Sequence, residues 1–359
     1  MLAADVFGDC ETRDAAHDVL VLDYQHGGFV AEDIHSRLLP AMESFAPDYF
    51  LYGSGFEMQP ALLDEIARHT LVLGNTADTV AAVKDPEVFF NACQASAISV
   101  PQIMLSPPDD VMDAWLVKQV GGSGGMHIKA YSNEMPLIPS AHVYYQKHVS
   151  GIPLSCLFLA NGQEVKTVSF QRQLLAPQLD GYAYRYGGLI SGIELSSELR
   201  TGIADAVLKL TKWFGLVGLN SLDFLVDDES LHVLEINPRL SASFSLSPHG
   251  SDLLRMHMLA CQRLELDLMG FPDQEAASES IIHLVVYAKH DLVIPAQFDW
   301  PQWVMDRPLP GFFVLADTPL CTVLASAEDA IKSEKLARQR AIILQNELSH
   351  FATKRNYNN

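Results

Sequence analysis

Residues 219–239 read LNSLDFLVDDESLHVLEINPR, two apolar runs on either side of the polar segment DDES. This pattern predicts a β-hairpin, in which successive side chains point to opposite faces of the sheet. On the first strand Ser221 and Asp223 share a face, and on the second Glu235 and Asn237 share one. If the turn brings Asp223 beside Glu235, two carboxylates and an amide lie together. Oxygen ligands of this kind hold hard cations when phosphate groups supply the remaining coordination.

An ordinary hairpin with a solvated polar face is the alternative interpretation. For a single Asp or Glu that interpretation is sufficient. The combination of Asp223, Glu235 and Asn237, followed two residues later by Arg239, favours a site for a metal ion and a phosphate-bearing ligand.

A glycine-rich loop follows an apolar strand at residues 115–120, which carries Lys118 near its end. Glycine lets backbone N–H groups approach an anion closely, and a lysine at the strand end adds a positive charge. The loop therefore suits a phosphate group, although a plain flexible turn beside a lysine would look the same. Its five residues are Gly121, Gly122, Ser123, Gly124 and Gly125.

Composition narrows the class of protein. Of the 359 residues, 48% are hydrophobic. The chain has 24 Lys and Arg but 44 Asp and Glu, so its net charge is −20. Such an acidic chain is repelled by nucleic acid and by anionic membrane surfaces. Five scattered cysteines without CxxC spacing indicate reduced thiols and no zinc or disulfide framework. No apolar run approaches a membrane span and the first residues lack a signal-peptide pattern, so we expect a soluble cytoplasmic protein.

The chain divides into recognisable segments. Strands and helices alternate over residues 19–73, which predicts a small parallel α/β unit. Neither GxGxxG nor GxxxxGK[ST] occurs, which argues against a Rossmann dehydrogenase and a P-loop enzyme. Residues 83–100 are predicted to form one helix carrying Lys84, and residues 327–351 a C-terminal amphipathic helix. The segment 299–311, with Trp300 and Trp303, is interpreted either as a homodimer contact or as a packed crossover loop.

Four elements together resemble the ATP-grasp superfamily. They are Lys84, VKQVGGSGG at 117–125, YYQKHVSGIPLS at 144–155 and the hairpin, and they occur in that family's order and spacing. The resemblance covers about residues 74–245. It implies a mixed fold of the α/β (α+β) class, the ATP-grasp fold. In this fold an N-terminal parallel α/β unit is followed by two sheet-containing subdomains that grip ATP. The implied domains are an N-terminal unit (1–82), a lid (83–146), a core with the metal hairpin (147–263) and a C-terminal extension (264–359).

The resemblance also implies roles for individual residues. Lys84 and Lys118 would contact the phosphates of ATP, and the glycine loop would fold over them. Arg239, with Lys118, would act on the transferred phosphoryl group and the acid. One or two Mg²⁺ ions, or Mn²⁺ as an alternative, would be held by Asp223, Glu235 and Asn237. The hinge beside adenine would consist of Gln146, Lys147, His148 and Val149.

Two positions depart from the family pattern. Gln146 stands where Glu is common, and its amide can still accept a hydrogen bond from the adenine amino group. Pro153 stands where an acidic residue usually meets the ribose, so ribose recognition differs from the pattern. The metal and phosphate elements are intact.

A narrower resemblance concerns the segment SFQRQLLAPQLDGYAYRYGGLISG at 169–192. It is similar to the carboxylate–amine ligase branch that includes tyramine–glutamate ligases of methanofuran synthesis. GSGFE at 53–57, LGNTADTV at 73–80, and DRPLPG and DTPLCTV near the C-terminus are similar to ATP-grasp proteins of C1-metabolising bacteria, associated with tetrahydromethanopterin or methanofuran-type cofactors. This implies substrate contacts by Arg172, Tyr184, Arg185 and Arg239; an ordered surface loop with exposed arginines is the alternative.

The implied reaction is ATP-dependent. The enzyme would convert a small carboxylic acid, with glutamate as one candidate, into an acyl phosphate and join it to an amine, releasing ADP and phosphate. Its partners would be small-molecule acids and amines. Two alternatives remain: a nucleotide-binding regulator without catalysis, and an ATP-grasp enzyme of another outcome, such as a carboxylase or a kinase-like enzyme.

Overall fold

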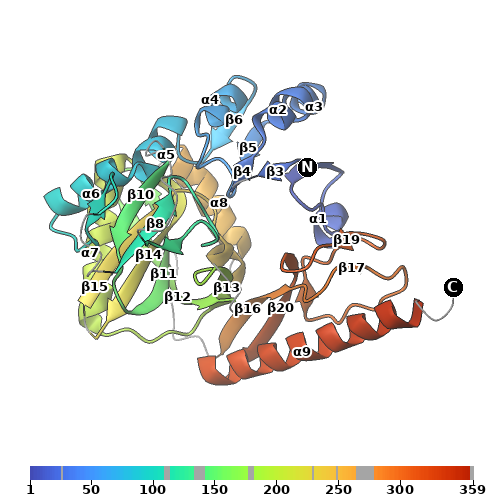
Figure 1. The fold of residues 1–359 in the computed structure, drawn as a ribbon. Helices are drawn as coiled ribbons and strands as arrows, with labels where there is room; N and C mark the ends of the chain where they lie inside the picture. Colours follow the sequence, from blue (N-terminus) through green and yellow to red (C-terminus); the bar gives the residue numbers. More distant parts are fainter. Residues whose placement is uncertain are drawn as a thin grey trace.

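The computed structural model describes residues 1–25, 27–108, 114–132, 142–176, 182–228, 230–247, 250–263 and 279–355. Residues 177–181 of the segment 169–192, and the start of the expected C-terminal extension at 264–278, lie outside the described residues. Figure 1 shows an N-terminal unit above a large sheet, with a long C-terminal helix along the lower side.

The N-terminal unit contains the predicted parallel strands. β1 (Leu2–Asp5) pairs in parallel with β2 (Asp18–Val21), and β5 (Tyr49–Leu51) pairs in parallel with β6 (Leu71–Leu73). The short strands β3 (Tyr24–Gln25) and β4 (Gly28–Phe29) form a hairpin. A continuous helical stretch follows, made of α2 (Ala31–Asp33), a π-helical turn η1 (Ile34–Leu38) and α3 (Leu39–Phe45). The remaining helices are α1 (Cys10–Ala15) and α4 (Ala61–Ala67).

The sequence prediction of one helix over residues 83–100 is wrong. α5 (Ala77–Lys84) ends at Lys84, and α6 (Pro86–Ala95) begins two residues later. Proline disfavours helical backbone in the residue before it. Asp85 is accordingly extended, with φ −72° and ψ 116°, and its carboxylate accepts from the N–H groups of Glu87 and Val88. The break leaves Lys84 in the last turn of α5.

A small antiparallel sheet carries the glycine loop. Its strand order is β7-β10-β8-β9, and the loop at residues 121–125 connects β8 to β9. Trp115, Val117, Val143 and Tyr145 form its apolar core. The strands are β7 (Ile103–Met104), β8 (Trp115–Gln119), β9 (Lys129–Ala130) and β10 (Val143–Lys147).

An eight-stranded antiparallel sheet forms the centre of the molecule. Its order is β15-β14-β11-β12-β13-β16-β20-β18, so C-terminal strands continue the sheet that carries the hairpin. The expected boundary after residue 263 thus separates segments that share one sheet. The strands are β11 (Ile152–Asn161), β12 (Val165–Leu175), β13 (Tyr186–Ile190), β14 (Val217–Asp227), β15 (Ser230–Asn237), β16 (Ser280–Tyr287), β18 (Val304–Met305) and β20 (Pro319–Ala327).

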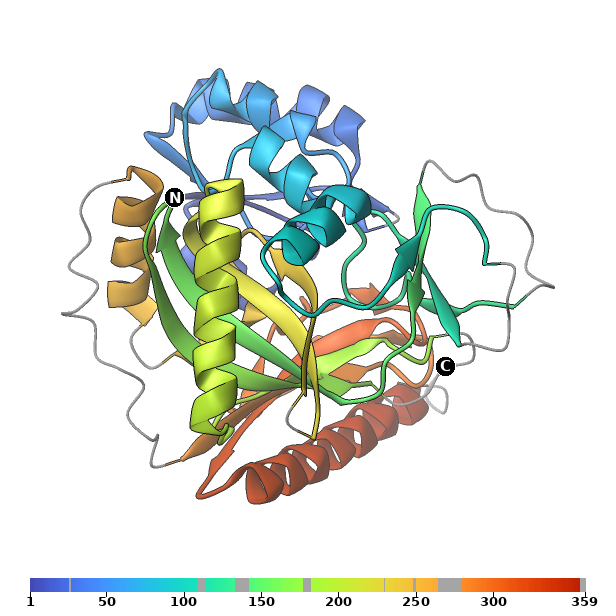
Figure 2. The ribbon, with the colours of Figure 1, turned by 90° about the vertical axis from the view of Figure 1, so that its left-hand side faces the viewer.

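Helices cover both faces of this sheet. The apolar stripe of α7 (Ser197–Phe214), with Ile203, Val207 and Leu210, packs on one face, and Figure 2 shows the helix running across the strands. α8 (Gly250–Cys261) packs on the opposite face through Leu253. The 3-10 turn η2 (Ala242–Leu246) leads from the hairpin towards it.

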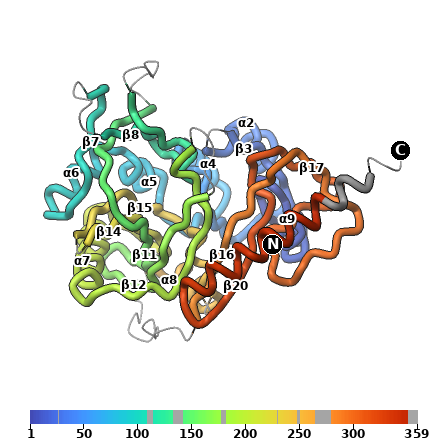
Figure 3. The backbone as a smooth tube through the Cα atoms, turned by 60° about the horizontal axis from the view of Figure 1, so that its bottom comes forward, coloured from blue at the N-terminus to red at the C-terminus, as the bar shows by residue number. Residues whose placement is uncertain are grey.

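The C-terminal helix packs as the sequence predicts. α9 (Ala330–Arg355) lies along β16 and β20, with Ala337 and Leu344 buried in the core that they share (Figure 3). Trp300 and Trp303 pack against the same core, and the hairpin of β17 (Leu292–Val293) and β19 (Phe313–Val314) lies beyond it. Across the described part of the chain, no helix is both long and apolar enough to cross a membrane.

Candidate active site

The hairpin β14–β15 places its polar residues together. Asp223 lies opposite Glu235 and Ser221 lies opposite Asn237 in the antiparallel register. Asn237 Nδ2 donates to Asp223 Oδ2 at 3.1 Å, and Ser155 Oγ on β11 donates to Asp223 Oδ1 at 2.8 Å. Register partners share a face of the sheet. The pairing of Asp223 with Glu235 that the alternation predicts is therefore present.

Lys84 meets this group from the end of α5. Its ammonium donates to Glu235 Oε2 at 2.9 Å and to Asn237 Oδ1 at 3.0 Å. Lys84 is buried, with 8% of its surface exposed. Lys84 is the last residue of α5, directly before the break at Asp85.

Lys118 approaches from the small sheet. Its ammonium donates to Gln146 Oε1 at 3.2 Å on the neighbouring strand β10 and lies 5.8 Å from the centre of the Tyr144 ring. Burial alone would lower the pKa of Lys118, but Tyr144, Glu235 and Asp223 outweigh that effect and the pKa is raised. Lys118 is therefore a buried permanent cation facing the hairpin carboxylates.

The two hairpin carboxylates have opposite electrostatic environments. Burial by itself would raise the pKa of Glu235, but Lys84 and then Lys118 lower it to about 2. Burial, followed by the negative charge of Glu235, raises the pKa of Asp223 against hydrogen bonds from Ser155 and Gln173. One carboxylate is thus firmly ionised beside another whose charge is unfavourable. A divalent cation bound by both would relieve that repulsion, and two carboxylates with an amide oxygen are a fitting donor set for Mg²⁺.

Arg239, two residues beyond the hairpin, forms a buried ion pair with a residue of the N-terminal unit. Its Nε donates to Glu57 Oε1 at 2.7 Å, and the two side chains are 10% and 2% exposed. Burial would raise the pKa of Glu57, but Arg239 and then Lys84 hold it below its usual value. Glu57 was not among the residues that the sequence analysis selected, although it ends the GSGFE segment singled out there.

The glycine loop is held close to two other segments. Gly121, Gly124 and Gly125 have φ of +71°, +69° and +75°, a region that favours glycine. A Cβ on Gly125 would lie 1.9 Å from the carbonyl oxygen of Tyr184. Gly124 O accepts from Tyr186 N–H at 2.9 Å. The loop is thereby tied to the start of β13.

His127, just after the loop, is a second residue that the sequence analysis did not select. Its Nδ1 lies 3.2 Å from Ser123 O, and a Cβ on Gly122 would meet its ring at 2.4 Å. Burial, countered by Glu235 but aided by Lys118, lowers the pKa of His127, so the ring is neutral at pH 7. The contact of His127 with the loop could not be predicted from the sequence, because a single His after a glycine loop is not part of a recognisable pattern.

The expected hinge lies at the end of β10. Gln146 is buried, with 4% of its surface exposed. The N–H of Lys147 donates to Gln102 O at 2.8 Å, and the N–H of His148 donates to Ala114 O at 2.9 Å. These bonds fix the backbone that leads through Val149 into β11. Pro153 lies within β11, opposite Leu225.

The residues expected at the substrate do not all meet at the site. On β12 Gln173 bonds to Asp223, so the adjacent Arg172 points to the other face, where its guanidinium pairs with Glu334 of α9. Arg185 donates to Asp317 O at 3.1 Å and stacks on Tyr287 at 3.9 Å from its centroid. Both arginines thus contact the C-terminal segment. Tyr184 lies against the glycine loop through its backbone, within the field of Lys118.

The described residues include no group of three or more His, Cys, Asp or Glu that could hold a metal. The arrangement at the hairpin is of another type, because its third oxygen comes from Asn237.

Known proteins support the fold. An ATP-grasp domain model matches residues 85–243. An uncharacterized protein of Methanocaldococcus jannaschii is 22% identical over 224 residues, which are 61% of this chain and 52% of that protein. The matched segment therefore spans about half the length of this relative.

Solved structures resemble nearly the whole chain. The biotin carboxylase of Campylobacter jejuni, in complex with a β,γ-ATP compound, superposes with a TM-score of 0.68 at 15% identity, covering 92% of this chain and 82% of that one. The biotin carboxylase domain of the Hydrogenobacter thermophilus 2-oxoglutarate carboxylase, bound to MgADP, ADP and bicarbonate, superposes with a TM-score of 0.69 at 12% identity, covering 91% and 81%. At these identities the likeness shows the fold alone. The chain therefore has the ATP-grasp fold, and residues 85–243 match the ATP-grasp domain.

Proposed function

We propose that this protein is an ATP- and Mg²⁺-dependent ligase that activates a carboxylic acid as an acyl phosphate and joins it to an amine. The observation that carries the proposal is that Lys84 bonds to Glu235, while Lys118 and Arg239 are buried within the electrostatic field of Asp223 and Glu235. In a protein with a net charge of −20, such buried cations are suited to a polyanionic nucleotide.

The residues divide the work by charge. Asp223, Glu235 and Asn237 would hold Mg²⁺, which offsets phosphate charge when bound. Lys84, which bonds to Glu235 and Asn237 here, would turn to the phosphates. Lys118 would contact the phosphates beneath the glycine loop, and the hinge at residues 146–149 would face adenine.

Arg239 is held in place by its bond to Glu57 and would orient the acid. The carboxylate oxygen attacks the γ-phosphorus of ATP and ADP leaves. The amine nitrogen then attacks the acyl carbon, the C–O bond to phosphate breaks, and phosphate departs as the nitrogen loses a proton. The glycine loop would exclude water from the acyl phosphate. Of the residues expected at the substrate, Tyr184 and Arg239 are kept in this proposal and Arg172 and Arg185 are not.

A hydroxylamine trap tests the chemistry without knowledge of the amine. The full chain is incubated with Mg-ATP, hydroxylamine and pooled carboxylic acids including L-glutamate, and hydroxamate, ADP and AMP are measured. We expect acid-dependent hydroxamate with ADP, lost in Glu235→Gln and kept in Glu347→Gln, which removes an exposed carboxylate on α9.

Other outcomes identify the alternatives. AMP in place of ADP would mean that an adenylate forms. ADP release that depends on neither an acid nor hydroxylamine would indicate a carboxylase or kinase-like enzyme. ATP binding without turnover would indicate a regulator. A role in methanofuran- or tetrahydromethanopterin-type cofactor synthesis is supported by the sequence resemblance, and the acid that gives hydroxamate is its first test.

A further inference from the structure

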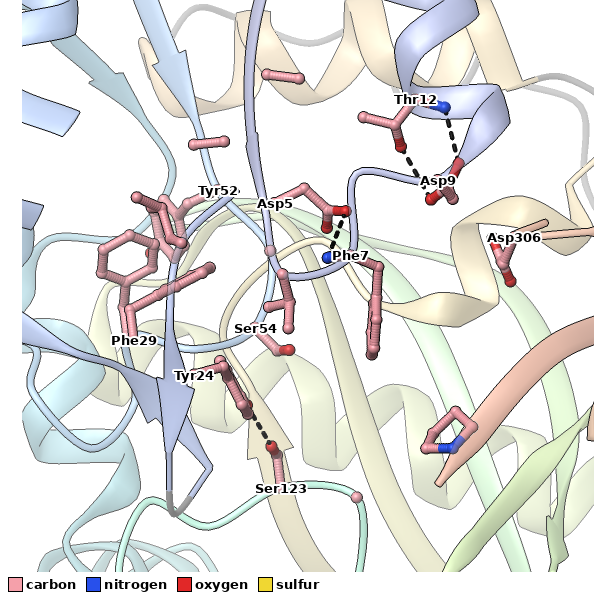
Figure 4. A pocket seen from close by; sticks show the side chains of 18 of the residues that line it. Asp5, Phe7, Asp9, Thr12, Tyr24, Phe29, Tyr52, Ser54, Ser123 and Asp306 are labelled. Atoms are coloured by element: carbon pink, nitrogen blue, oxygen red, sulfur yellow. Dashed lines mark hydrogen bonds between the residues drawn. The ribbon is translucent and has the colours of Figure 1, made fainter. Parts of the chain in front are cut away.

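A large cavity, part of whose lining is drawn in Figure 4, reaches the glycine loop at Ser123. Its volume is about 1650 Å³. Its walls come from the first residues of the chain, the β3–β4 hairpin, residues 45–54, the glycine loop, β13, the segment 306–314 and the C-terminal strands β16 and β20. None of the residues proposed to hold ATP or metal outside the loop lines it: Lys84, Lys118, Gln146, Asp223, Glu235 and Asn237 are all absent from its walls. The cavity is therefore distinct from the nucleotide site and meets it at the glycine loop.

The walls of the cavity are aromatic and acidic. Among the described residues that line it, none is Lys or Arg, whereas Asp5, Asp9, Asp48 and Asp306 carry negative charge. Such a lining disfavours an anion and attracts a cation, which aromatic faces also stabilise. The aromatic side chains include Phe7, Tyr24, Phe29, Tyr52, Tyr186 and Tyr287.

Asp306 is the carboxylate best placed for a ligand. It follows β18 with a left-handed backbone, φ +55°, and lies at the wall opposite Tyr24 and Phe29 in Figure 4. The adjacent cation, Arg307, is engaged by Glu11 through its guanidinium and through its backbone N–H at 3.0 Å. Desolvation, together with Asp9 and Glu11, raises the pKa of Asp306 against a hydrogen bond from Thr322. Its negative neighbours thus disfavour the charge on Asp306, and a bound cation would favour it.

Tyr186 connects the cavity to the proposed reaction centre. Its N–H bonds to Gly124 O, and its carbonyl accepts from Tyr287 Oη at 2.7 Å. Burial, and after it the charge of Asp223, raises the pKa of Tyr186, and Asp306 adds to the same effect. The phenol therefore lies within the field of both carboxylates, one on the hairpin and one in the cavity.

We propose that this cavity binds the amine co-substrate, and that this amine is a cation on a sizeable apolar or aromatic body whose ammonium group Asp306 binds. The assignment rests on the proposed ligase function. It also separates the two substrates by charge. The acid lies near Arg239 and the two lysines, and the amine lies near the aspartates of the cavity.

Three probes on one carbon skeleton test the assignment: 4-phenylbutylamine, 4-phenylbutanol and 4-phenylbutanoate. Binding of each to the full chain is measured by isothermal titration calorimetry without ATP. We expect the amine to bind at least about tenfold more tightly than the alcohol, and the carboxylate to bind weakest. Equal binding of the three, or preference for the carboxylate, overturns the assignment.

Variants locate the binding. Asp306→Asn keeps a residue type that tolerates positive φ, and we expect it to remove the preference for the amine over the alcohol. Asp205→Asn makes the same change of charge at an exposed site on α7 and should leave the preference intact. Phe7→Ala removes a residue that is 51% exposed, so folding is not at risk. This variant should bind all three probes more weakly. An unchanged preference in Asp306→Asn overturns the role of Asp306.

The hydroxylamine assay separates the two proposals, because it requires no amine substrate. If hydroxamate forms in the wild-type protein but no amine preference exists, the cavity assignment fails alone. If the amine preference exists but no acid yields hydroxamate, the ligase function fails alone.

Discussion

The guanidinium of Arg239 donates to the carboxylate of Glu57 at 2.7 Å, although 182 residues separate the two in the chain. Glu57 also accepts from Gly55 N–H at 2.7 Å, which fixes its carboxylate within the N-terminal unit. This contact joins the N-terminal unit to the end of the metal hairpin. It therefore makes the position of Arg239, and with it the proposed acid site, dependent on the first 60 residues.

Glu57→Gln should be strongly destabilising. It leaves the Arg239 guanidinium buried without its counter-charge, and removal of one partner of a buried ion pair costs about 3–5 kcal/mol. Urea unfolding of the variant measures this cost. Asp205→Asn breaks the exposed pair with Lys209 and should cost less than about 1 kcal/mol. Similar costs for the two variants would contradict the importance of the Glu57–Arg239 pair.

The hairpin could be predicted from the sequence because its information is local. Alternation along two adjacent strands is sufficient to place Asp223 beside Glu235, and the structure has that register. Glu57 could not be predicted in the same way, because its partner is distant in sequence and no local pattern connects them.

The contacts of the substrate segment could not be predicted for a different reason. The aromatic and glycine-rich composition of residues 169–192 does not indicate the face of the sheet on which each side chain lies. Strand alternation sends Arg172 towards Glu334 on α9, and Arg185 packs on Tyr287 of β16. Both contacts are with residues more than a hundred positions further along the chain. The single helix predicted over residues 83–100 is broken because Pro86 disfavours helical backbone at Asp85.

Gly125→Ala should abolish hydroxamate formation. A Cβ at Gly125 would lie 1.9 Å from a backbone carbonyl, so the loop must move away from β13. Gly124→Ala is the matched control, since its φ is also positive but no atom lies within 4 Å of its Cβ. The control should lose about 1 kcal/mol of stability through backbone strain and keep most activity. Equal activities in the two variants would show that the contact with Tyr184 is dispensable.

Asp223→Asn should raise the Mg²⁺ concentration needed for half-maximal ADP release by at least about tenfold, a loss of ~1.4 kcal/mol in metal binding. The reason is that one of two carboxylates in the donor set becomes neutral. The hydroxylamine assay at fixed ATP and varied Mg²⁺ measures this, and EDTA should stop the wild-type reaction. Asp227→Asn, at the exposed end of the same strand, should match the wild type. A lower rate with unchanged Mg²⁺ dependence would remove Asp223 from the metal site.

His283 should make the fold sensitive to mild acid. Burial lowers its pKa to about 4, and its Nδ1 lies 2.9 Å from Ser245 Oγ. In the unfolded chain the pKa is about 6.5, so above that pH the residue is neutral in both states and has no effect. As the pH falls from about 6.5 to 4, the unfolded chain binds a proton that the folded chain does not, and the fold loses about 3 kcal/mol of stability.

His283→Gln removes this titration while keeping a neutral polar side chain. On going from pH 7 to pH 4, the free energy of unfolding of the wild type should therefore fall by about 3 kcal/mol more than that of the variant. Urea unfolding of both proteins at several pH values measures it. A difference that stays constant over this range would mean that the imidazole is as easily protonated in the folded protein as in the unfolded chain, and that β16 leaves it accessible to water.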